Sequence, residues 1–438
     1  MTDARRVFVF SREYPPTTVG GTSTVARNLA AGLVAEGWEA VVVTSRPGAA
    51  EDLRERIDGV TVHRVGTEVV YNAGSGLADD SLLIHRRFHR AAEALAAELG
   101  APALVALPDL FCYPEAAMFA RRHGVPLVNV LLQDFRAITP YDRDKHRVTS
   151  GVTADRSHLL ELERKSVLGS DHTVFISRAL SDAITGYYPE NTAPHSVVHL
   201  GVDPAEIASV AGDPQWLRRR TELALGSAPL LVGCGRLVPV KGFAQLLRAL
   251  EVLGAVEVPG TAGAVLPHLA LVGVGPEEEE LRRLAAASGL AERVTFLGDV
   301  PRQEALGWMS VADVNVVPSL WESFCYVCAE MMAFGHPVVA SAVDSLRELI
   351  PGPEYGYPVP VSGPSGDRTL DPADLAAALR QALEQPEEAR LRGGAAQRRI
   401  AECFTNERFA QGIAALGEDL TAGRQETARQ ATGQRTDG

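Results

Sequence analysis

Two successive alternations of short β-branched runs with amphipathic segments are the feature that most constrains the fold of this chain. The first begins with a strand expected at 6–11, a helix at 22–36 with its apolar residues on one face, and a strand at 40–44. This is a βαβ unit. Further strands of the first half are expected at 103–107, 126–132, 172–176 and 196–200, and helices at 114–123 and 177–187. The pattern predicts a parallel, doubly wound sheet.

The same alternation restarts at 229, after a polar stretch at 201–214 that carries turn residues. Its strands are expected at 229–233, 268–272, 294–297, 313–317 and 338–340, and its helices at 243–253, 277–288, 303–311 and 327–334. A chain of 438 residues also exceeds what one hydrophobic core usually organises. The prediction is therefore an α/β protein with two Rossmann-like doubly wound parallel-sheet domains. Ligands of such sheets bind at the carboxyl ends of the strands, so a cleft between the domains is expected to hold the site.

The domain boundaries follow from this reading. The first domain is expected over 1–205 and the second over 206–402, with a helix over 403–420 that packs back on the first domain. The polar, glycine-containing tail 421–438 is expected to be disordered. Two long segments, 67–80 and 135–156, interrupt the alternation of strands and helices. They are predicted to be lids or binding loops.

Charge and composition argue against several classes of partner. The formal net charge of −13 disfavours nonspecific binding to nucleic acid, which requires many basic side chains. No apolar run approaches the roughly 20 residues that span a bilayer, and residues 1–10 lack the pattern of a secretory signal, so a cytoplasmic location is expected. The basic cluster 85–90 could contact anionic lipid, but a solvated helix face is the more common role, and membrane contact is not expected. A monomer or homodimer is expected.

The five cysteines are scattered, which is typical of reduced thiols in a large chain. Cys325 and Cys328 form a Cys-x-x-Cys pair, but a single pair supplies only two of the four ligands of a structural zinc. No metal site is expected.

Two basic residues follow the first strand of the second domain. Arg236 and Lys241 lie in the glycine-containing segment 233–242, between a predicted strand and a predicted helix. Exposed amides and the dipole at a helix start favour a phosphate group, so the pair predicts a diphosphate site. The alternative is that both are solvated loop cations.

Two glutamates, Glu322 and Glu330, flank a strand end, a loop and a helix start. Seven residues separate them, so they do not form a close pair on one helix face. They suit a ligand with separated hydroxyl groups, such as a sugar near Glu322 and a ribose near Glu330. The alternative is that Glu330 pairs locally and Glu322 is a surface residue.

Four segments, in order along the chain, resemble the retaining GT-B glycosyltransferases of family 4 (group 1 type). The segment 318–330 is similar to the family's Glu, seven residues, Glu signature, and 333–340 to the strand that follows it. Arg236 and Lys241 match its diphosphate-binding pair, and 14–21 is similar to its N-terminal glycine loop.

The resemblance implies a retaining, metal-independent hexosyltransferase. It would move a hexose or aminohexose from a nucleoside diphosphate sugar, with UDP favoured over GDP, to a small hydroxylated acceptor such as an aminocyclitol or another natural-product precursor. The first domain would bind the acceptor and the second the donor, with no cofactor besides the donor as co-substrate. The implied catalytic residues are Arg236, Lys241 and Glu322, of which the cations would stabilise the departing diphosphate. The implied donor contacts are Gly20, Gly21, Arg236, Lys241, Val300, Glu322, Ser323, Phe324, Cys325, Tyr326 and Glu330.

Several positions depart from the family pattern. Ser323 and Cys325 replace two glycines of the donor-sugar loop, Asp344-Ser345 stands where paired glycines are common, and Gln133 replaces a histidine. Asp109, Gln133 and Asp134 are candidate acceptor contacts. Asp109 and Asp134 also form, with Glu115, Asp142 and Asp144, a loose acidic set that would suit a cationic acceptor. Solvated loop carboxylates are the alternative.

Three other functions remain open on the sequence. A nucleotide-sugar 2-epimerase shares the architecture, and a glycosyltransferase of this type can act on a cell-envelope lipid or polysaccharide. A noncatalytic sugar-nucleotide-binding subunit would fit the altered glycines and Gln133.

Overall fold

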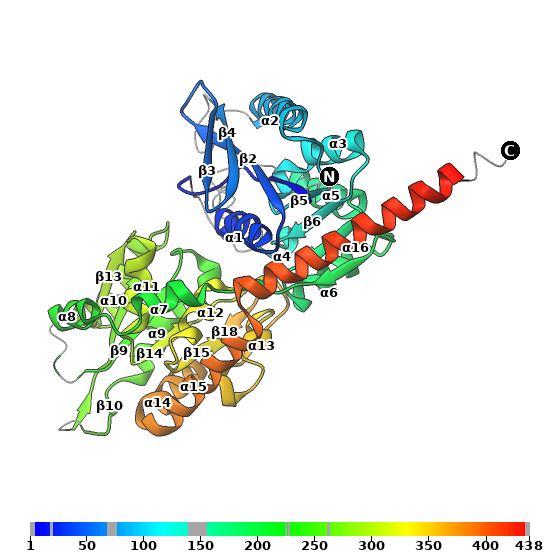
Figure 1. Ribbon diagram of the computed structural model, residues 1–438. Coiled ribbons are helices and arrows are strands. Elements are labelled where there is room, and N and C mark those ends of the chain that lie inside the picture. The colour runs from blue at the N-terminus through cyan, green and yellow to red at the C-terminus, as the bar shows by residue number, and fades with distance from the viewer. Residues whose placement is uncertain are drawn as a thin grey trace. The chain divides into compact units, whose positions relative to one another are not determined.

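The computed structural model describes residues 5–17, 21–67, 77–138, 156–223, 226, 228–260 and 263–433. The chain divides into two compact units, of which the first comprises 1–200 with 406–438 and the second comprises 201–405. Each unit is built around its own sheet (Figure 1). Gly20, Asp142 and Asp144 lie outside the described residues, as do most of the two long segments predicted as loops.

The first unit contains an eight-stranded sheet in the order β3-β4-β2-β1-β5-β6-β7-β8. Its strands are β1 Arg6–Phe10, β2 Glu39–Pro47, β3 Leu53–Ile57, β4 Val60–Thr67, β5 Leu104–Leu107, β6 Leu127–Leu131, β7 His172–Phe175 and β8 His195–Val197. All pairings are parallel except that of β3 with β4, which is antiparallel and forms the edge of the sheet. The central strands are buried apolar runs, as expected where helices cover both faces of a parallel sheet.

The helices of the first unit include one contributed by the end of the chain. They are α1 Gly21–Ala35, α2 Leu77–Leu99, η1 Leu110–Cys112, α3 Tyr113–His123, α4 Phe135–Ile138, α5 Arg156–Gly169, α6 Arg178–Tyr187 and α16 Asn406–Gly433. Helix α16 packs on α1 so closely that a β-carbon added at Gly32 would lie 2.4 Å from the β-carbon of Ala410.

Helix α16 is longer than the sequence predicted. It continues to Gly433, so the disorder expected from Thr421 onward is wrong over 421–433. The polarity of this segment suggested disorder, but its Ala, Arg, Gln and Glu residues are also good helix formers, and they extend a helix already anchored on α1.

The second unit contains a six-stranded, fully parallel sheet in the order β13-β12-β9-β14-β15-β16. Its strands are β9 Leu230–Cys234, β12 His268–Val272, β13 Val294–Gly298, β14 Val314–Val317, β15 Val338–Ser341 and β16 Tyr357–Val359. Two small antiparallel pairs accompany it, β10 Val256–Glu257 with β11 Ala264–Val265, and β17 Val361–Ser362 with β18 Thr369–Leu370. Strand order reverses at β9, so the topological switch point, where such sheets bind ligands, lies between β9 and β14.

The helices of the second unit include several that the sequence reading missed. They are α7 Pro204–Val210, α8 Pro214–Glu222, η3 Pro239–Lys241, α9 Phe243–Leu253, α10 Glu278–Ala287, η4 Ala291–Arg293, α11 Arg302–Ser310, α12 Tyr326–Ala333, α13 Leu346–Leu349, η5 Pro353–Tyr355, α14 Pro372–Glu384 and α15 Pro386–Cys403. The polar stretch 201–214 is therefore helix α7 and the start of α8 rather than a turn-rich linker. Asp203 and Asp213 cap these helices by accepting hydrogen bonds from Ala205 N at 2.8 Å and Gln215 N at 2.9 Å.

Candidate functional site

The loops that follow β9 and β14 meet at the switch point of the second sheet. Leu320 N donates a hydrogen bond to Val240 O at 2.7 Å, which joins the two loops through their backbones. Lys241 Nζ lies 2.6 Å from Glu322 Oε1, although the two residues are 81 positions apart in the chain. Ser319 Oγ donates to the same carboxylate oxygen at 2.8 Å. The structure thus brings together two of the three predicted catalytic residues.

Gly242 makes this approach possible. Its φ of +69° is in the left-handed region, and a β-carbon at this position would lie 2.0 Å from Pro318 O. Any larger residue would both strain the backbone and separate the two loops. Gly242 also forms the N-terminal cap of α9, so the same residue ends the Lys241 segment and begins the helix.

The charges at this point suit an anionic ligand. Burial by itself would lower the pKa of Lys241, but the adjacent Glu322 carboxylate outweighs it and the net pKa is raised, so Lys241 is a cation. The positive charge of Arg236 acts against this rise, which places its exposed guanidinium in the electrostatic neighbourhood of Lys241. An ion pair of Lys241 with Glu322, with a second cation in its electrostatic neighbourhood, therefore lies where a diphosphate is predicted to bind.

The segment after β15 stabilises the loop from Glu322 to Tyr326 through hydrogen bonds to its backbone. Ser345 Oγ lies 3.2 Å from Glu322 O and 3.0 Å from Phe324 O, which fixes the backbone of the loop. Phe324 is buried and its ring contacts that of Tyr326. Ser345, at a position where the family often has glycine, thus has a structural role that the sequence did not reveal.

Cys325 has an unusual backbone conformation. Its φ of +77° and ψ of +78° lie in the left-handed region, and it precedes α12 as the N-terminal cap. This is a conformation that glycine adopts readily and a residue with a β-carbon does not. Burial raises the pKa of the Cys325 thiol well above its usual range, so the thiol is protonated at neutral pH. Within the described part of the chain, no three His, Cys, Asp or Glu side chains gather as metal ligands would.

Glu330 lies on α12 and is 3% exposed. Arg302, at the start of α11, places Nη2 2.8 Å from Glu330 Oε1 and also contacts both carboxylate oxygens of Glu206. Burial raises the pKa of Glu330, and Arg302 offsets only part of this rise, so the net pKa is above its usual value. Sequence reasoning found Glu330 but missed Arg302 and Glu206. The half-buried Val300, one of the implied donor contacts, lies two residues before this helix start.

The acceptor candidates of the first unit are largely engaged in internal contacts. Asp109 forms a buried ion pair with Arg12, with Nε to Oδ2 at 2.9 Å and Nη2 to Oδ1 at 3.2 Å. Asp134 Oδ1 accepts hydrogen bonds from the backbone of α4, and Oδ2 accepts one from Tyr187 Oη at 3.1 Å. Gln133 is half-buried beside it, and Gly21 is exposed as the first residue of α1.

Glu163, a buried residue that the sequence analysis did not identify, stabilises the backbone next to Gln133 and Asp134. Glu163 on α5 is fully buried, accepts a hydrogen bond from Phe135 N at 3.1 Å and another from Tyr188 Oη at 2.8 Å. Burial raises the pKa of Glu163 to about 7. Its contact with Phe135 N fixes the backbone immediately after Gln133 and Asp134.

The remaining predicted surface features are partly paired within the first unit. His85 Nδ1 lies 2.5 Å from the buried Glu115, and Arg87 lies 3.2 Å from Asp52. Two side chains of the basic cluster 85–90 are thus occupied by carboxylates. In the described residues, no helix has the length and apolar character needed to cross a membrane.

Two family models match the chain and together cover both units. The Glycosyl transferase 4-like domain matches residues 20–201, and Glycosyl transferases group 1 matches residues 215–399, the range that contains Arg236, Lys241, Glu322 and Glu330. The chain belongs to the group 1 glycosyltransferases. This confirms the family inferred from the four segments and the predicted enzyme class.

Individual relatives agree with this assignment. A glycogen synthase of Mycobacterium tuberculosis (strain H37Rv) is 27% identical over 412 residues, which covers 91% of each chain. A D-inositol 3-phosphate glycosyltransferase of Thermomonospora curvata is 31% identical over 277 residues, 61% of this glycosyltransferase and 60% of the relative. The solved sucrose-phosphate synthase from Thermosynechococcus elongatus shares the fold with a TM-score of 0.74 and 22% identity, covering 96% of this chain and 100% of that one. The predicted GT-B fold, with two Rossmann-like parallel-sheet units, is confirmed.

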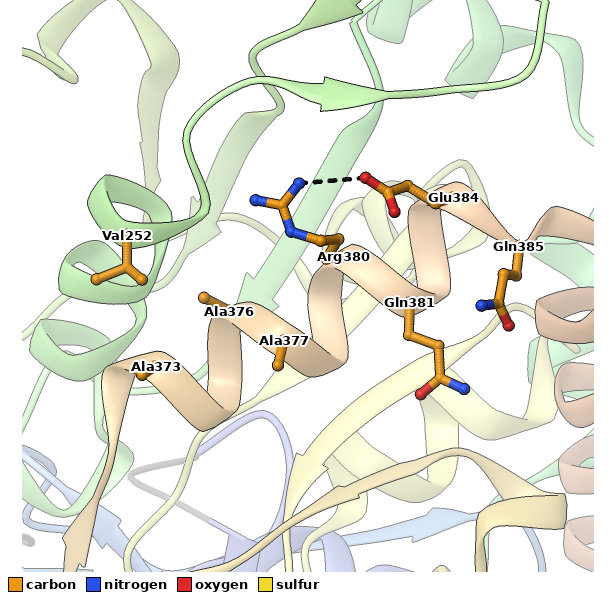
Figure 2. A pocket seen from close by; sticks show the side chains of 8 residues that line it. All are labelled: Val252, Ala373, Ala376, Ala377, Arg380, Gln381, Glu384 and Gln385. Carbon is orange, nitrogen blue, oxygen red and sulfur yellow. Dashed lines mark hydrogen bonds and ion pairs between the residues drawn. The ribbon is translucent and has the colours of Figure 1, made fainter.

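A groove elsewhere on the second unit lacks comparable chemistry. It has a volume of about 380 Å³ and runs along α14, facing Val252 of α9 (Figure 2). Three alanines form much of its wall, and its charged pair, Arg380 and Glu384, is joined by a 3.1 Å contact. The carboxyl ends of β9 and β14 are therefore the candidate active site.

Proposed function

We propose that this glycosyltransferase moves a hexose or aminohexose from a nucleoside diphosphate sugar to a small hydroxylated acceptor, with retention of the anomeric configuration and without a metal ion. UDP is favoured over GDP as the nucleotide. The observation that carries the proposal is the contact of Lys241 with Glu322 at the switch point, with the exposed Arg236 in the same electrostatic neighbourhood.

The diphosphate would bind Lys241 and Arg236. Glu322 pairs with Lys241, and a diphosphate would add negative charge on which both cations act. That charge grows as the glycosidic bond breaks, so cations fixed in advance stabilise the transition state more than the ground state. The leaving phosphate itself would help to take the acceptor proton.

The donor sugar and the ribose would bind on either side of the diphosphate. Glu322 and the amides of 323–326, at the start of α12, would hold the sugar hydroxyls. Glu330, eight residues further along the chain, would accept hydrogen bonds from the ribose. Ser323 and Cys325 add side chains where the family has glycines, which narrows the sugar site.

The acceptor would bind the first unit near Gln133. Among the described acceptor candidates, Asp109 and Asp134 already hold internal partners, which leaves the amide of Gln133 as the group best able to bind a neutral hydroxyl. The names of the two relatives above describe a polymer product and a cyclitol phosphate acceptor, so both kinds of acceptor belong in the assay.

A nucleotide screen followed by a transfer assay tests the proposal. UDP, GDP and their sugars are screened by thermal shift, because a ligand that binds only the native state at 100 times its Kd stabilises the protein by about 2.7 kcal/mol. Transfer is then measured to cyclitols, cyclitol phosphates and glucans, and the anomeric configuration of the product is read by NMR. Retained configuration is expected.

Lys241→Ala and Glu330→Ala are expected to lower the transfer rate by about 10²-fold or more. Lys165→Ala is the matched control, because Lys165 is a surface lysine paired with Glu161 on α5. Rates near the wild-type value in both site variants would refute the site assignment. An epimerised free nucleotide sugar, formed without any acceptor, would instead identify a 2-epimerase, and tight nucleotide binding without turnover would identify a noncatalytic subunit.

A further inference from the structure

Arg302 joins two carboxylates that come from different helices of the second unit. It is the first residue of α11. Its Nε lies 2.7 Å from Glu206 Oε1 and its Nη2 lies 2.8 Å from Glu206 Oε2, so the contact with α7 is bidentate. The same Nη2 lies 2.8 Å from Glu330 Oε1 on α12. The three side chains form a continuous chain of alternating charge.

The Glu206 contact holds the guanidinium group in place. A bidentate pair fixes the plane of an arginine side chain, which would otherwise sample many rotamers. Glu206 is itself well placed, because it lies in the first turn of α7, whose cap is Asp203. Both α7 and α12 pack against α11, so the chain of charges spans three helices in mutual contact. Arg302 therefore meets Glu330 in a defined orientation.

Glu330 needs such a partner to act as a hydrogen-bond acceptor. Its side chain is 4% exposed, and a carboxylate so deeply buried is costly unless a cation and hydrogen bonds compensate it. An ionised carboxylate accepts hydrogen bonds through both oxygens, whereas a protonated one donates through one of them. A vicinal diol offers two O–H donors. The ionised, oriented form of Glu330 is the form that matches it.

We propose that Arg302, anchored by Glu206, is a positioning residue that orients Glu330 for the ribose diol of the nucleotide. This inference rests on the proposed function, in which Glu330 takes the ribose. Arg302 acts through Glu330 and sets how strongly the enzyme distinguishes a ribose from a sugar that lacks both hydroxyls.

The test compares nucleotides with and without the diol. Binding of UDP and GDP, and of the 2′,3′-dideoxy counterpart of each, is measured by calorimetry on the full chain. Wild-type protein is expected to bind its preferred ribonucleotide at least about tenfold more tightly than the dideoxy form, since hydrogen bonds to a charged group contribute that much or more. In Arg302→Met this ratio is expected to fall toward one, through weaker binding of the ribonucleotide and little change for the dideoxy form.

Two further variants separate positioning from simple damage to the fold. Glu206→Gln removes the anchor without touching Glu330 and is expected to lower the ratio in the same direction but less. Arg219→Met is the matched control, because Arg219 on α8 pairs with Glu304 of the same helix α11 at 2.7 Å. Its ratio is expected to equal that of the wild type.

The outcomes are distinct. If Arg302→Met and Glu206→Gln weaken both nucleotide forms equally and keep the wild-type ratio, the two residues have only a structural role and the inference is wrong. If wild-type protein binds nucleotide without preferring the diol, the assignment of ribose to Glu330 fails and the inference falls with it. If it binds neither nucleotide, the proposed function itself fails.

Discussion

Replacing Cys325 by glycine and by alanine tests whether the left-handed turn at the start of α12 is strained. With φ at +77°, an L-residue brings its β-carbon too close to the following carbonyl oxygen. This steric strain costs roughly 1–2 kcal/mol of folding free energy. Glycine removes this cost, but it also loses about 0.5–1 kcal/mol through the greater freedom of the unfolded chain. Alanine keeps the strain and loses the sulfur atom, as glycine does.

The difference between the unfolding free energies of the two variants therefore reports the backbone strain at position 325. Cys325→Gly is expected to be more stable than Cys325→Ala by about 0.75 kcal/mol, the middle of the roughly 0–1.5 kcal/mol that remains when the entropy lost is subtracted from the strain relieved. For a unit of about 200 residues this corresponds to a rise in Tm of roughly 1–4 °C. Differential scanning calorimetry of the full chain, with the transition of the second unit followed, measures it.

Cys328 provides the matched control within the same helix. It is fully buried in the first turn of α12, where glycine has poor helix propensity and leaves a methyl-sized void. There glycine is expected to be less stable than alanine by about 1.5–2 kcal/mol. The order of the two variants should thus reverse between positions three residues apart. If the glycine variant is less stable than the alanine variant at both positions, the strain argument is refuted.

Two other predictions concern stability. Gly242→Ala should lower the Tm of the second unit far more than Gly254→Ala, because both positions have a positive φ but only at Gly242 would the new β-carbon collide, at 2.0 Å, with Pro318 O; equal losses would contradict this. Glu163, whose pKa is raised from 4.5 to about 7, holds a proton in the folded protein that the unfolded chain releases. Stability of the first unit should therefore fall as pH rises from about 4.5 to 7, by on the order of 3 kcal/mol. Glu163→Gln should remove this slope in thermal unfolding measured across pH, and an unchanged slope would show that another group titrates.

Most central strands were predictable because parallel sheets bury continuous apolar runs, whereas the strands β3, β4 and β16 were not predicted. The helix α9, for example, begins and ends at the expected residues, Phe243 and Leu253. Helices α7 and α8 were missed because both are short and are preceded by a capping Asp with Pro at the first helical position, a dipeptide that is also a turn signal. The same dipeptide opens α14, so Asp as a cap with Pro at the first helical position was the available clue.

The site was predictable only in part, because sequence motifs identify residues but not their partners. The spacing of Glu322 and Glu330 indicated two separate carboxylates, and the structure pairs each with a cation from a distant segment. The pairing of Lys241 with Glu322 depends on the order of strands in the sheet. Arg302 and Glu206 depend on the packing of three short helices, for which no local pattern exists.

The sequence left two alternatives for Glu322 and Glu330, a local structural contact or a role in ligand binding. The ion pairs of these residues allow the two alternatives to be tested. A buried ion pair contributes little net stability, because desolvation offsets the Coulomb attraction, and apolar residues of similar volume often replace it without loss. The pair of Lys241 and Glu322 is mostly buried, with side chains 24% and 9% exposed. If it exists for ligand binding, Lys241→Met with Glu322→Leu should leave the Tm of the second unit within a few degrees of the wild type while abolishing nucleotide-sugar turnover. Lys241→Met alone should be the less stable protein, by up to about 3–5 kcal/mol, because it leaves a buried carboxylate without its cation. A double variant as unstable as the single one would show instead that the pair holds the two loops together, and that its catalytic use is secondary to that role.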